Sequence, residues 1–152
     1  MNVSSCMKKN VVSVKLNTTI REVAALIVDK HIGLLPIVDE SNKPIGVIGL
    51  WDLLELELPD FVKFVADVDF VHDFGAVEVT RPPAKKLDKT VKSLIRPITT
   101  VEEDCGLLRA YALMLQQNLH DMPVVSKAGK LVGITSRVDL GCAILSTWSK
   151  VG

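Results

Sequence analysis

The chain has 152 residues, the size of one ordinary domain, and 48% of them are apolar. Eighteen basic and eighteen acidic side chains give a formal net charge of 0, which argues against a nucleic-acid binder that depends on a basic surface. Mean hydropathy is +0.31, so we expect a packed core rather than a disordered chain.

Features of targeting and redox chemistry predict a cytoplasmic protein. No apolar run approaches the ~18–20 residues of a membrane helix, and residues Met1 to Lys9 lack the hydrophobic stretch of a signal peptide. The three cysteines, Cys6, Cys105 and Cys142, form no CxxC pair and their number is odd. A reducing compartment with free thiols is therefore expected.

An internal repeat organises the chain. At an offset of 87 residues, without a gap from about Met7 to Leu53, the chain aligns with itself on proline, glycine and aspartate. The aligned pairs include Pro36/Pro123, Val38/Val125, Lys43/Lys130, Gly46/Gly133 and Asp52/Asp139. The sequence therefore predicts two copies of one structural unit.

The first half of each copy predicts a strand followed by a helix. Residues 11–14 form a short β-rich run, and Thr19 with Glu22 predicts a capping box at the helix start. Apolar residues at helical spacing then predict one buried face. They are Ile20, Val23, Ala24 and Ile27 in the first copy and Leu107, Ala110, Tyr111 and Met114 in the second.

The second half of each copy predicts a hairpin followed by a helix. Apolar runs separated by turn residues predict the hairpin strands at 34–38 and 45–50, and again at 122–125 and 131–135. Asp52 and Asp139 each open a final apolar segment that is expected to be helical. A β-α-β-β-α unit of this size is too small to be stable alone, so two copies should pack together.

The segment between the copies, residues 54–90, is longer than a simple connector. Phenylalanine and valine residues at 61–74 suggest one or two helices, and residues 81–86 are expected to form an extended, solvated loop. Two interpretations stay open: an elaborated connection that covers an exposed edge, or a lid or docking surface for a partner.

The predicted fold class is α+β, with two β-α-β-β-α repeats packed with pseudo-twofold symmetry into one module. The expected organisation is repeat 1 at residues 1–58, an insertion at 59–90 and repeat 2 at 91–152. The apolar helices near Leu53–Leu54 and from Leu140 to Trp148 could form the interface of a homodimer.

The two copies resemble a tandem pair of cystathionine-β-synthase (CBS) domains, also called a Bateman module. The second copy carries the sequence HDMPVV at 120–125 and GITSRVD at 133–139, and the first carries GLLPIV at 33–38 and GVIGLWD at 46–52. The resemblance covers residues of about 5–58 and 91–148. It implies a regulatory module that binds an adenosine-containing ligand, such as AMP, ADP, ATP or S-adenosylmethionine, between the repeats.

The resemblance implies a leading site around Asp139. An ionised Asp139 would accept hydrogen bonds from both ribose hydroxyls, and Ser136 would add a hydroxyl where the chain enters a helix. Free N–H groups at that helix end would favour a phosphate. The expected ligand-binding residues are Ser136, Asp139, Ile134, Val12, Ile32, Gly33, Leu34, Leu35, Pro36 and His120.

A second, pseudo-symmetric site is expected to be weaker or empty. Gly49 stands where the family has serine or threonine, so a hydroxyl donor is lost. The residues expected in this second site are Asp52, Val47, Thr99, Leu119, Asp121, Met122 and Pro123.

Asp121 departs from the pattern of nucleotide-binding relatives, which often carry a basic residue at this position. A carboxylate repels a phosphate, so triphosphates are disfavoured unless Mg²⁺ or a lysine such as Lys8 compensates. The sequence therefore favours a neutral or cationic adenosyl ligand such as S-adenosylmethionine.

Several polar residues also have purely structural interpretations. Asp139 could act only as a helix N-cap, and His120 could be a structural histidine before a strand. His31 at a helix end and Cys105 beside acidic residues are expected to be structural. An acidic helix face, rather than a metal site, is expected for Asp67, Asp69, His72 and Asp73.

The sequence predicts a regulatory module rather than an enzyme. It has no GxSxG, HExxH, P-loop or dinucleotide fingerprint, and no tightly bound cofactor is expected. A standalone sensor would relay ligand binding to a separate, unidentified protein. The alternative function is a protein-interaction or scaffold module that binds no small molecule, and a nucleic-acid-binding regulator is disfavoured by the neutral net charge.

Overall fold

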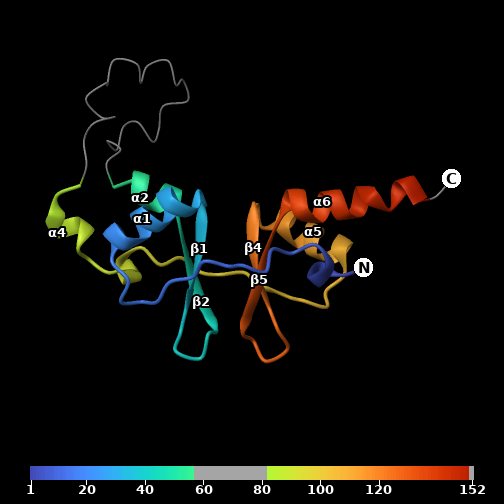
Figure 1. Ribbon diagram of the computed structural model, residues 1–152, viewed down its shortest axis with the longest axis horizontal. Helices are drawn as coiled ribbons and strands as arrows, with labels where there is room; N and C mark the ends of the chain where they lie inside the picture. The colour runs from blue at the N-terminus through green and yellow to red at the C-terminus, as the bar shows by residue number, and fades with distance from the viewer. Residues whose placement is uncertain (57–81, 151–152) are drawn as a thin grey trace, which may run out of the picture.

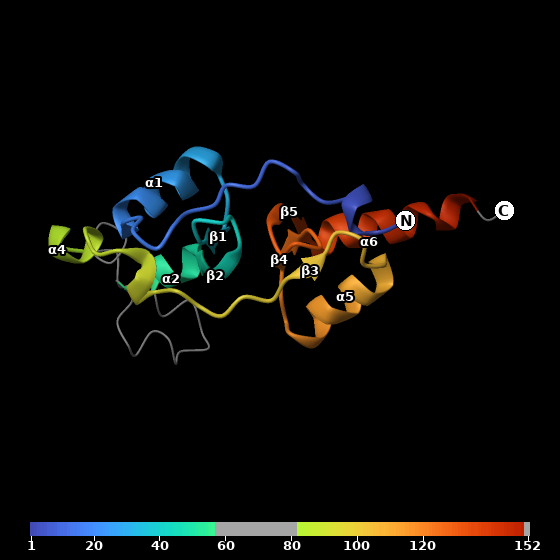
Figure 2. The same ribbon diagram turned by 90° about the horizontal axis from the view of Figure 1, so that it is seen from below.

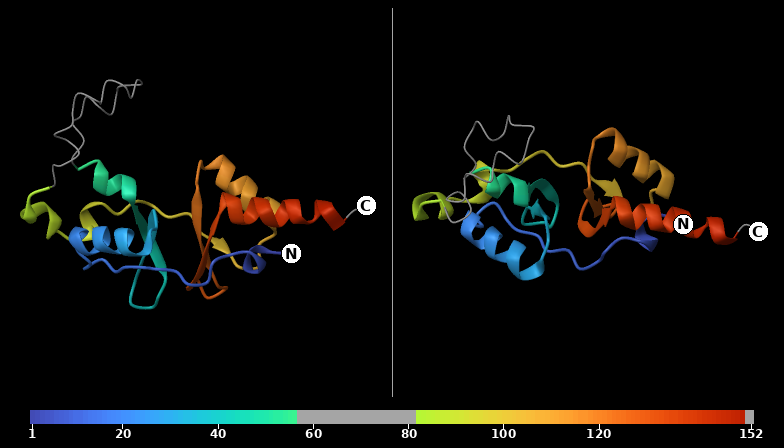
Figure 3. Two further views of the ribbon diagram at one scale, coloured as in Figure 1. Left: turned by 45° about the horizontal axis from the view of Figure 1, so that its top comes forward. Right: turned by 90° about the horizontal axis from the view of Figure 1, so that it is seen from above.

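The computed structural model describes residues 1–56 and 82–150 as two similar halves joined side by side (Figure 1). Each half has a β-hairpin near the middle of the molecule and helices on its outer side (Figures 1 and 3). The first half contains α1 (Ile20–Lys30), β1 (Leu34–Val38), β2 (Pro44–Gly49) and α2 (Leu50–Leu54), followed by α4 (Ala84–Leu87) and η4 (Val91–Ser93). The second half contains β3 (Val101–Glu102), α5 (Leu107–Gln116), β4 (Asp121–Val125), β5 (Leu131–Ser136), α6 (Arg137–Ser146) and η5 (Trp148–Lys150), and η1 (Val3–Ser5) lies beside it. In the described ranges, no helix is long and apolar enough to cross a membrane.

The two predicted amphipathic helices are present. At the start of α1 the Thr19 hydroxyl accepts from the Glu22 N–H at 3.1 Å, and the Glu22 carboxylate accepts from the Thr19 N–H at 3.0 Å, which confirms the capping box. Both helices bury the residues expected from their spacing, except that Ala24 and Tyr111 are only partly buried. The fully or nearly buried positions are Ile20, Val23 and Ile27 in α1 and Leu107, Ala110 and Met114 in α5.

The two hairpins have the same register. β1 pairs antiparallel with β2, and β4 pairs antiparallel with β5. The register shifts between Ile37 and Val38 in the first hairpin and between Val124 and Val125 in the second. These shifts occupy equivalent positions of the repeat, so the irregularity belongs to the repeated unit rather than to one copy.

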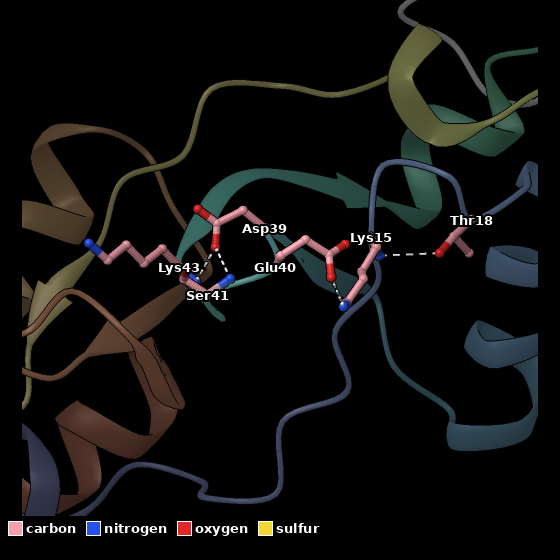
Figure 4. Close-up of polar contacts among 6 residues, drawn as sticks. All are labelled: Lys15, Thr18, Asp39, Glu40, Ser41 and Lys43. Atoms are coloured by element: carbon pink, nitrogen blue, oxygen red, sulfur yellow. Dashed lines mark hydrogen bonds and ion pairs between the residues drawn. The ribbon is translucent and has the colours of Figure 1, made fainter.

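The turn of the first hairpin is closed by one aspartate (Figure 4). The Asp39 Oδ1 accepts from the backbone N–H groups of Ser41 at 2.8 Å and Lys43 at 2.9 Å. Beside the turn, Lys15 forms an exposed ion pair with Glu40 at 3.0 Å. Aspartate is favoured in turns because its short side chain can accept from the backbone of the following residues.

The predicted strand at residues 11–14 is wrong, because only Val14 pairs with the hairpin. Val14 contacts β1 opposite Ile37, and after it the Lys15 N–H turns aside to the Thr18 hydroxyl at 3.2 Å. In the second repeat, β3 forms a short parallel strand beside β4, and the following Glu103 N–H continues the pairing to the Val125 carbonyl at 2.9 Å. The two sheets therefore have two and three strands.

Each repeat completes the core of the other. Val3 is fully buried in the core of the second half, and Val91 is fully buried in the core of the first half. The chain reaches these places through two crossing segments, residues 8–13 and 96–100, which run between the halves (Figure 2). The core of the second half needs Val3, which precedes the first repeat in the sequence. The core of the first half needs Val91, which precedes the second repeat.

The crossing segments also correct the alignment of the copies. Lys8 pairs with Ile134 and Arg96 with Val47, so the offset is 88 between Lys8 and Arg96 but 87 between Val47 and Ile134. The gap-free offset expected from about Met7 is therefore wrong at its N-terminal end. At the offset of 88, the segments before the slip align Val3 with Val91 and Ser5 with Ser93.

The tips of the hairpins are joined across the halves. The Leu131 N–H donates to the Asn42 carbonyl at 2.9 Å, and the Asn42 side-chain amide donates to the Leu131 carbonyl at 3.2 Å. The symmetric counterpart of the first bond needs an N–H at residue 44, which is a proline. The tip is thus closed by an asymmetric contact.

Part of the inter-repeat segment is described, and it differs from the expected loop. Residues 84–87 form the short helix α4 after Pro83, with the Lys86 N–H bonded to the Pro83 carbonyl at 2.9 Å. Alanine, lysine and leucine are good helix formers, which explains the turn. The helices expected at 61–74, and the acidic group at Asp67, Asp69, His72 and Asp73, lie outside the described residues.

Candidate functional site

A cavity of about 390 Å³ lies between the two repeats, at the ends of the hairpins away from the joined tips. Its volume is within the range of small-molecule sites, roughly 300–1,000 Å³. The lining residues come from both repeats and one crossing segment: Gly33, Leu34, Val47, Gly49, Leu50, Trp51, Arg96, Pro97, Thr99, Asn118, Leu119, His120, Asp121 and Pro123.

A larger, open hollow of about 800 Å³ lies along α5 and is lined by residues of the second repeat alone. Because it is formed by one repeat, it offers no place where a ligand would hold the two repeats together. The cavity between the repeats is therefore the candidate site.

The carboxylate of Asp52 stands beside this cavity. α2 begins at Leu50, so Asp52 lies in the first turn of the helix rather than opening it. The Gly49 N–H donates to Asp52 Oδ2 at 2.7 Å, and Arg96 Nε lies 2.9 Å from Oδ1 and 3.0 Å from Oδ2. The Asp52 side chain is only 12% exposed, whereas that of Arg96 is 50% exposed.

Ser136 and Asp139 form the equivalent group in the second repeat. Ser136 is the N-cap of α6; its hydroxyl accepts from the Asp139 N–H at 3.0 Å, and Asp139 Oδ2 accepts from the Ser136 N–H at 3.0 Å. Asp139 is therefore not the N-cap but the third residue of a capping box. Among the residues that the structure describes, Asp139 Oδ1 accepts no hydrogen bond and Asp139 forms no ion pair.

The crossing segments pair with the second strand of each hairpin, β5 and β2. Lys8 exchanges two backbone hydrogen bonds of 2.9 Å with Ile134, and Arg96 exchanges two of 3.0 Å with Val47. The backbone groups of Ile134 and Val47 on that side are therefore already used. Only the side chains of these two residues can contact a ligand there.

The residues predicted for the leading site are spread over three places. Gly33, Leu34 and His120 line the cavity beside Asp52, whereas Ser136, Asp139 and Ile134 lie on the β5–α6 side of the second repeat. Leu35 and Pro36 are fully buried, and Val12 and Ile32 are partly buried against the first core.

Most residues predicted for the second site come together at the cavity. Val47, Thr99, Leu119, Asp121 and Pro123 line it, and Asp52 reaches it through its contacts with Gly49 and Arg96. Met122 is fully buried in the second core instead, because alternate residues of a strand point to opposite faces.

Five lining residues were not predicted from the sequence, and Gly49 was named only as the position of a lost hydroxyl. The five are Leu50, Trp51, Arg96, Pro97 and Asn118. Trp51 is 70% exposed at the cavity. Asn118 has φ of 53°, the same left-handed conformation that His31 adopts as the C-cap of α1. Alignment at the offset of 87 places Lys8 opposite Ile95, so it did not show that Arg96 is the equivalent of Lys8.

Burial raises the pKa of the Asp121 carboxyl. The positive charges of Lys8 and His120 oppose this shift, while the negative charge of Asp139 adds to it. Burial likewise raises the pKa of the Cys6 thiol, with a smaller lowering contribution from Thr135. In the described part of the chain, no group of histidine, cysteine and carboxylate side chains is arranged to hold a metal ion.

Comparison with known proteins identifies the repeated unit. The CBS-domain family matches residues 3–58 and 91–145. The chain is 30% identical over 135 residues to the chloroplastic CBS domain-containing protein CBSX1 of Arabidopsis thaliana, covering 86% of this chain and 57% of that protein. It is 29% identical over 140 residues to the uncharacterized protein MJ1404 of Methanocaldococcus jannaschii, covering 91% of this chain and 30% of that protein. The chain thus spans little more than half, or less, of these relatives.

Solved structures show the same arrangement of two repeats. CBSX2 from Arabidopsis thaliana superposes with a TM-score of 0.74 at 26% identity, covering 97% of this chain and 96% of that chain. The crystal structure of CBSX2 in complex with AMP gives a TM-score of 0.71 at 27% identity, with 97% and 98% covered. The chain therefore belongs to the CBS-domain family, and its α+β fold is a tandem pair of CBS repeats.

Proposed function

We propose that this chain is a regulatory CBS pair that binds an adenosine-containing ligand, of the AMP, ADP, ATP or S-adenosylmethionine type, between its repeats. The observation that carries the proposal is the cavity lined by both repeats, with a helix-capping carboxylate beside it. The relative CBSX2, which is 27% identical and has the same fold, was solved in complex with AMP.

The chemistry of the cavity suits such a ligand. Leu34, Val47 and Pro123 offer apolar surface to a flat base. An aspartate in the first turn of a helix can accept hydrogen bonds from a ribose diol, and Arg96 and His120 can meet an anionic group. On the other side, Asp139 has an oxygen without a donor among the described residues, so we keep it as a second candidate for ribose binding.

Ligand binding would act by fixing the distance between the repeats. The hairpins are joined at their tips through Asn42 and Leu131, whereas the cavity lies at their opposite ends. A ligand that contacts both ends favours one arrangement of the repeats by its difference in affinity. The chain would relay this change to a separate protein without transforming the ligand.

We also propose that the protein is a homodimer in a reducing, cytoplasmic environment, with its three cysteines free. Leu140 is fully buried and serves the core, so the proposed interface uses the apolar side chains that α2, α5, α6 and η5 leave exposed. Apart from Leu50 and Trp51, which line the cavity, they are Leu54, Leu108, Leu115, Val138, Leu145 and Trp148. Sedimentation of the wild type with the mass of a monomer would contradict this part of the proposal.

Isothermal titration calorimetry with AMP, ATP and S-adenosylmethionine tests the proposed function. The variants are Asp52→Asn and Asp139→Asn, which keep the shape and a capping oxygen, and Asp39→Asn in the first hairpin turn is the matched control. We expect at least one ligand to bind the wild type and the control, and binding to weaken about tenfold in one of the two site variants.

No heat from any ligand, with a folded wild-type protein, would overturn the proposal. It would favour the alternative, a protein-interaction or scaffold module that binds no small molecule. Equal binding by the wild type and both site variants would show that ligands bind outside the two carboxylate sites.

A further inference from the structure

The Asp52 carboxylate is already occupied by an arginine of its own chain. Arg96 Nε lies 2.9 and 3.0 Å from the two carboxylate oxygens, and Gly49 N–H donates to one of them at 2.7 Å. The single Nε–H donates to Oδ2, which also accepts from Gly49, and the guanidinium stands against Oδ1. A ribose diol that approaches Oδ1 therefore meets Arg96 and competes with it for the carboxylate.

The backbone of Arg96 is fixed, but its side chain can move. Two backbone hydrogen bonds of 3.0 Å hold it to Val47, while half of the side chain is exposed to solvent. The guanidinium can thus leave Asp52 without disturbing the crossing segment. Since Arg96 itself lines the cavity, the displaced group stays beside a bound ligand.

A displaced guanidinium needs a new anionic partner. A phosphate matches its planar donors, whereas adenosine offers it only neutral groups. Loss of the Asp52 contact is therefore offset when the ligand carries a phosphate and is left uncompensated when it does not.

The charge of Asp121 does not remove this preference. Asp121 lines the cavity, but the charged groups that act on its pKa are Lys8, His120 and Asp139. Two positive charges, Lys8 and His120, thus act on Asp121 without the help of Arg96. Lys8 takes the place of Arg96 on the Asp139 side of the cleft, yet it forms no ion pair with Asp139 among the described residues.

We propose that Arg96 makes the Asp52 site selective for phosphate-bearing adenosine ligands, by competing with the ribose and then pairing with the phosphate. This inference rests on the proposed function and names the ligand class of one of its two sites. It differs from the expectation drawn from Asp121, which favoured a neutral or cationic adenosyl ligand.

Calorimetry with AMP and adenosine tests the inference in the Asp139→Asn background, where only the Asp52 site keeps its carboxylate. We expect AMP to bind about tenfold or more tightly than adenosine. Arg96→Gln should weaken AMP and tighten adenosine, so that the ratio of their affinities approaches one. Arg21→Gln is the matched control, because Arg21 forms an exposed 3.1 Å pair with Asp88 away from the cavity.

The failures of the two proposals are distinguishable. An affinity ratio that Arg96→Gln leaves unchanged overturns the inference but not the proposed function. The same holds if AMP binds the wild type and Asp139→Asn abolishes all binding, because the ligand then uses the Asp139 site alone. A wild type that binds neither AMP nor any other adenosyl ligand overturns both.

Discussion

The two halves of the cleft share a backbone and differ in their charges. In each, a capped helix presents an aspartate in its first turn, and a crossing segment pairs with the second hairpin strand, β2 or β5, through a basic residue. In the first half Arg96 neutralises Asp52, whereas in the second half Asp139 has no ion pair among the described residues. Duplication thus preserved the hydrogen-bonding frame, and the side chains on it diverged.

The crossing segments show a similar divergence in packing. A Cβ added to Gly46 would overlap the Ile95 side chain and lie 2.9 Å from the Arg96 carbonyl. A Cβ added to Gly133 would lie 2.6 Å from the Met7 sulfur and 2.9 Å from the Lys8 carbonyl. The glycines are required by the same close approach, but isoleucine is stiff where methionine is flexible.

The largest expected effect tests the comparison of Gly46 with Gly133. Gly46→Ala should lower the free energy of unfolding by about 3 kcal/mol and Gly133→Ala by about 1 kcal/mol, because the methionine can move away while the isoleucine cannot. Urea denaturation measures both. Equal losses would show that the carbonyl contacts, which are alike, decide the cost rather than the side chains.

The exchange of core residues gives a second test. Val3→Ala and Val91→Ala should each lower the free energy of unfolding by about 2 kcal/mol, since each removes two buried methyl groups and leaves a cavity. Hydrogen exchange locates the damage: Val3→Ala should expose amides of β4, and Val91→Ala those of β1. Loss of protection in the first repeat for Val3→Ala, or in the second repeat for Val91→Ala, would contradict the exchange of core residues between the repeats.

The cap of α6 can be converted into that of α2. Ser136→Ala should lower the free energy of unfolding by about 1 kcal/mol, but Ser136→Gly, which copies Gly49, only by a few tenths of a kcal/mol. Thr19→Ala, at the matching capping box of α1, is the control and should cost about 1 kcal/mol. A glycine variant as unstable as the alanine variant would mean that the Ser136 hydroxyl does more than cap the helix.

The smallest expected effect concerns Asp121. Because burial raises its pKa above the ordinary value of 3.8, the folded state binds the proton more tightly than the unfolded state. The wild type should therefore lose stability as the pH rises from about 4 through the raised pKa, and this loss is absent in Asp121→Asn. The variant should gain about 0.5 kcal/mol or less at neutral pH, since Asp121 is partly exposed, and nothing below pH 4. Thermal unfolding at several pH values measures the difference, and a variant less stable at neutral pH would contradict it.

Local patterns explain which predictions succeeded. The capping box at Thr19, the buried faces of α1 and α5, and both hairpins depend on residues close in sequence, so spacing and turn residues were enough to find them. The strand at residues 11–14 depended instead on where the chain turns after Val14, and the loop at 81–86 on helix propensity over one turn.

The candidate site depends on contacts between the two repeats, which the sequence pattern of a single repeat does not contain. Sequence resemblance identified Asp52, Val47, Thr99, Leu119, Asp121 and Pro123 as a group, and the cavity lies among them. It ranked the Asp139 side higher because a hydroxyl was missing at Gly49. It did not find the Arg96–Asp52 pair, which joins residues separated by 44 positions.

The sequence by itself determined the duplication, the succession of helix, hairpin and helix in each repeat and the membership of the CBS-domain family, because these follow from local periodicity and recurring residues. Tertiary structure alone decided that Val3 and Val91 complete each other's repeats, that Arg96 holds Asp52 and that the cavity opens beside that pair. The physical reason is that burial and ion pairing depend on which distant segments meet, and a one-residue slip in a crossing segment changes which side chain reaches the cleft.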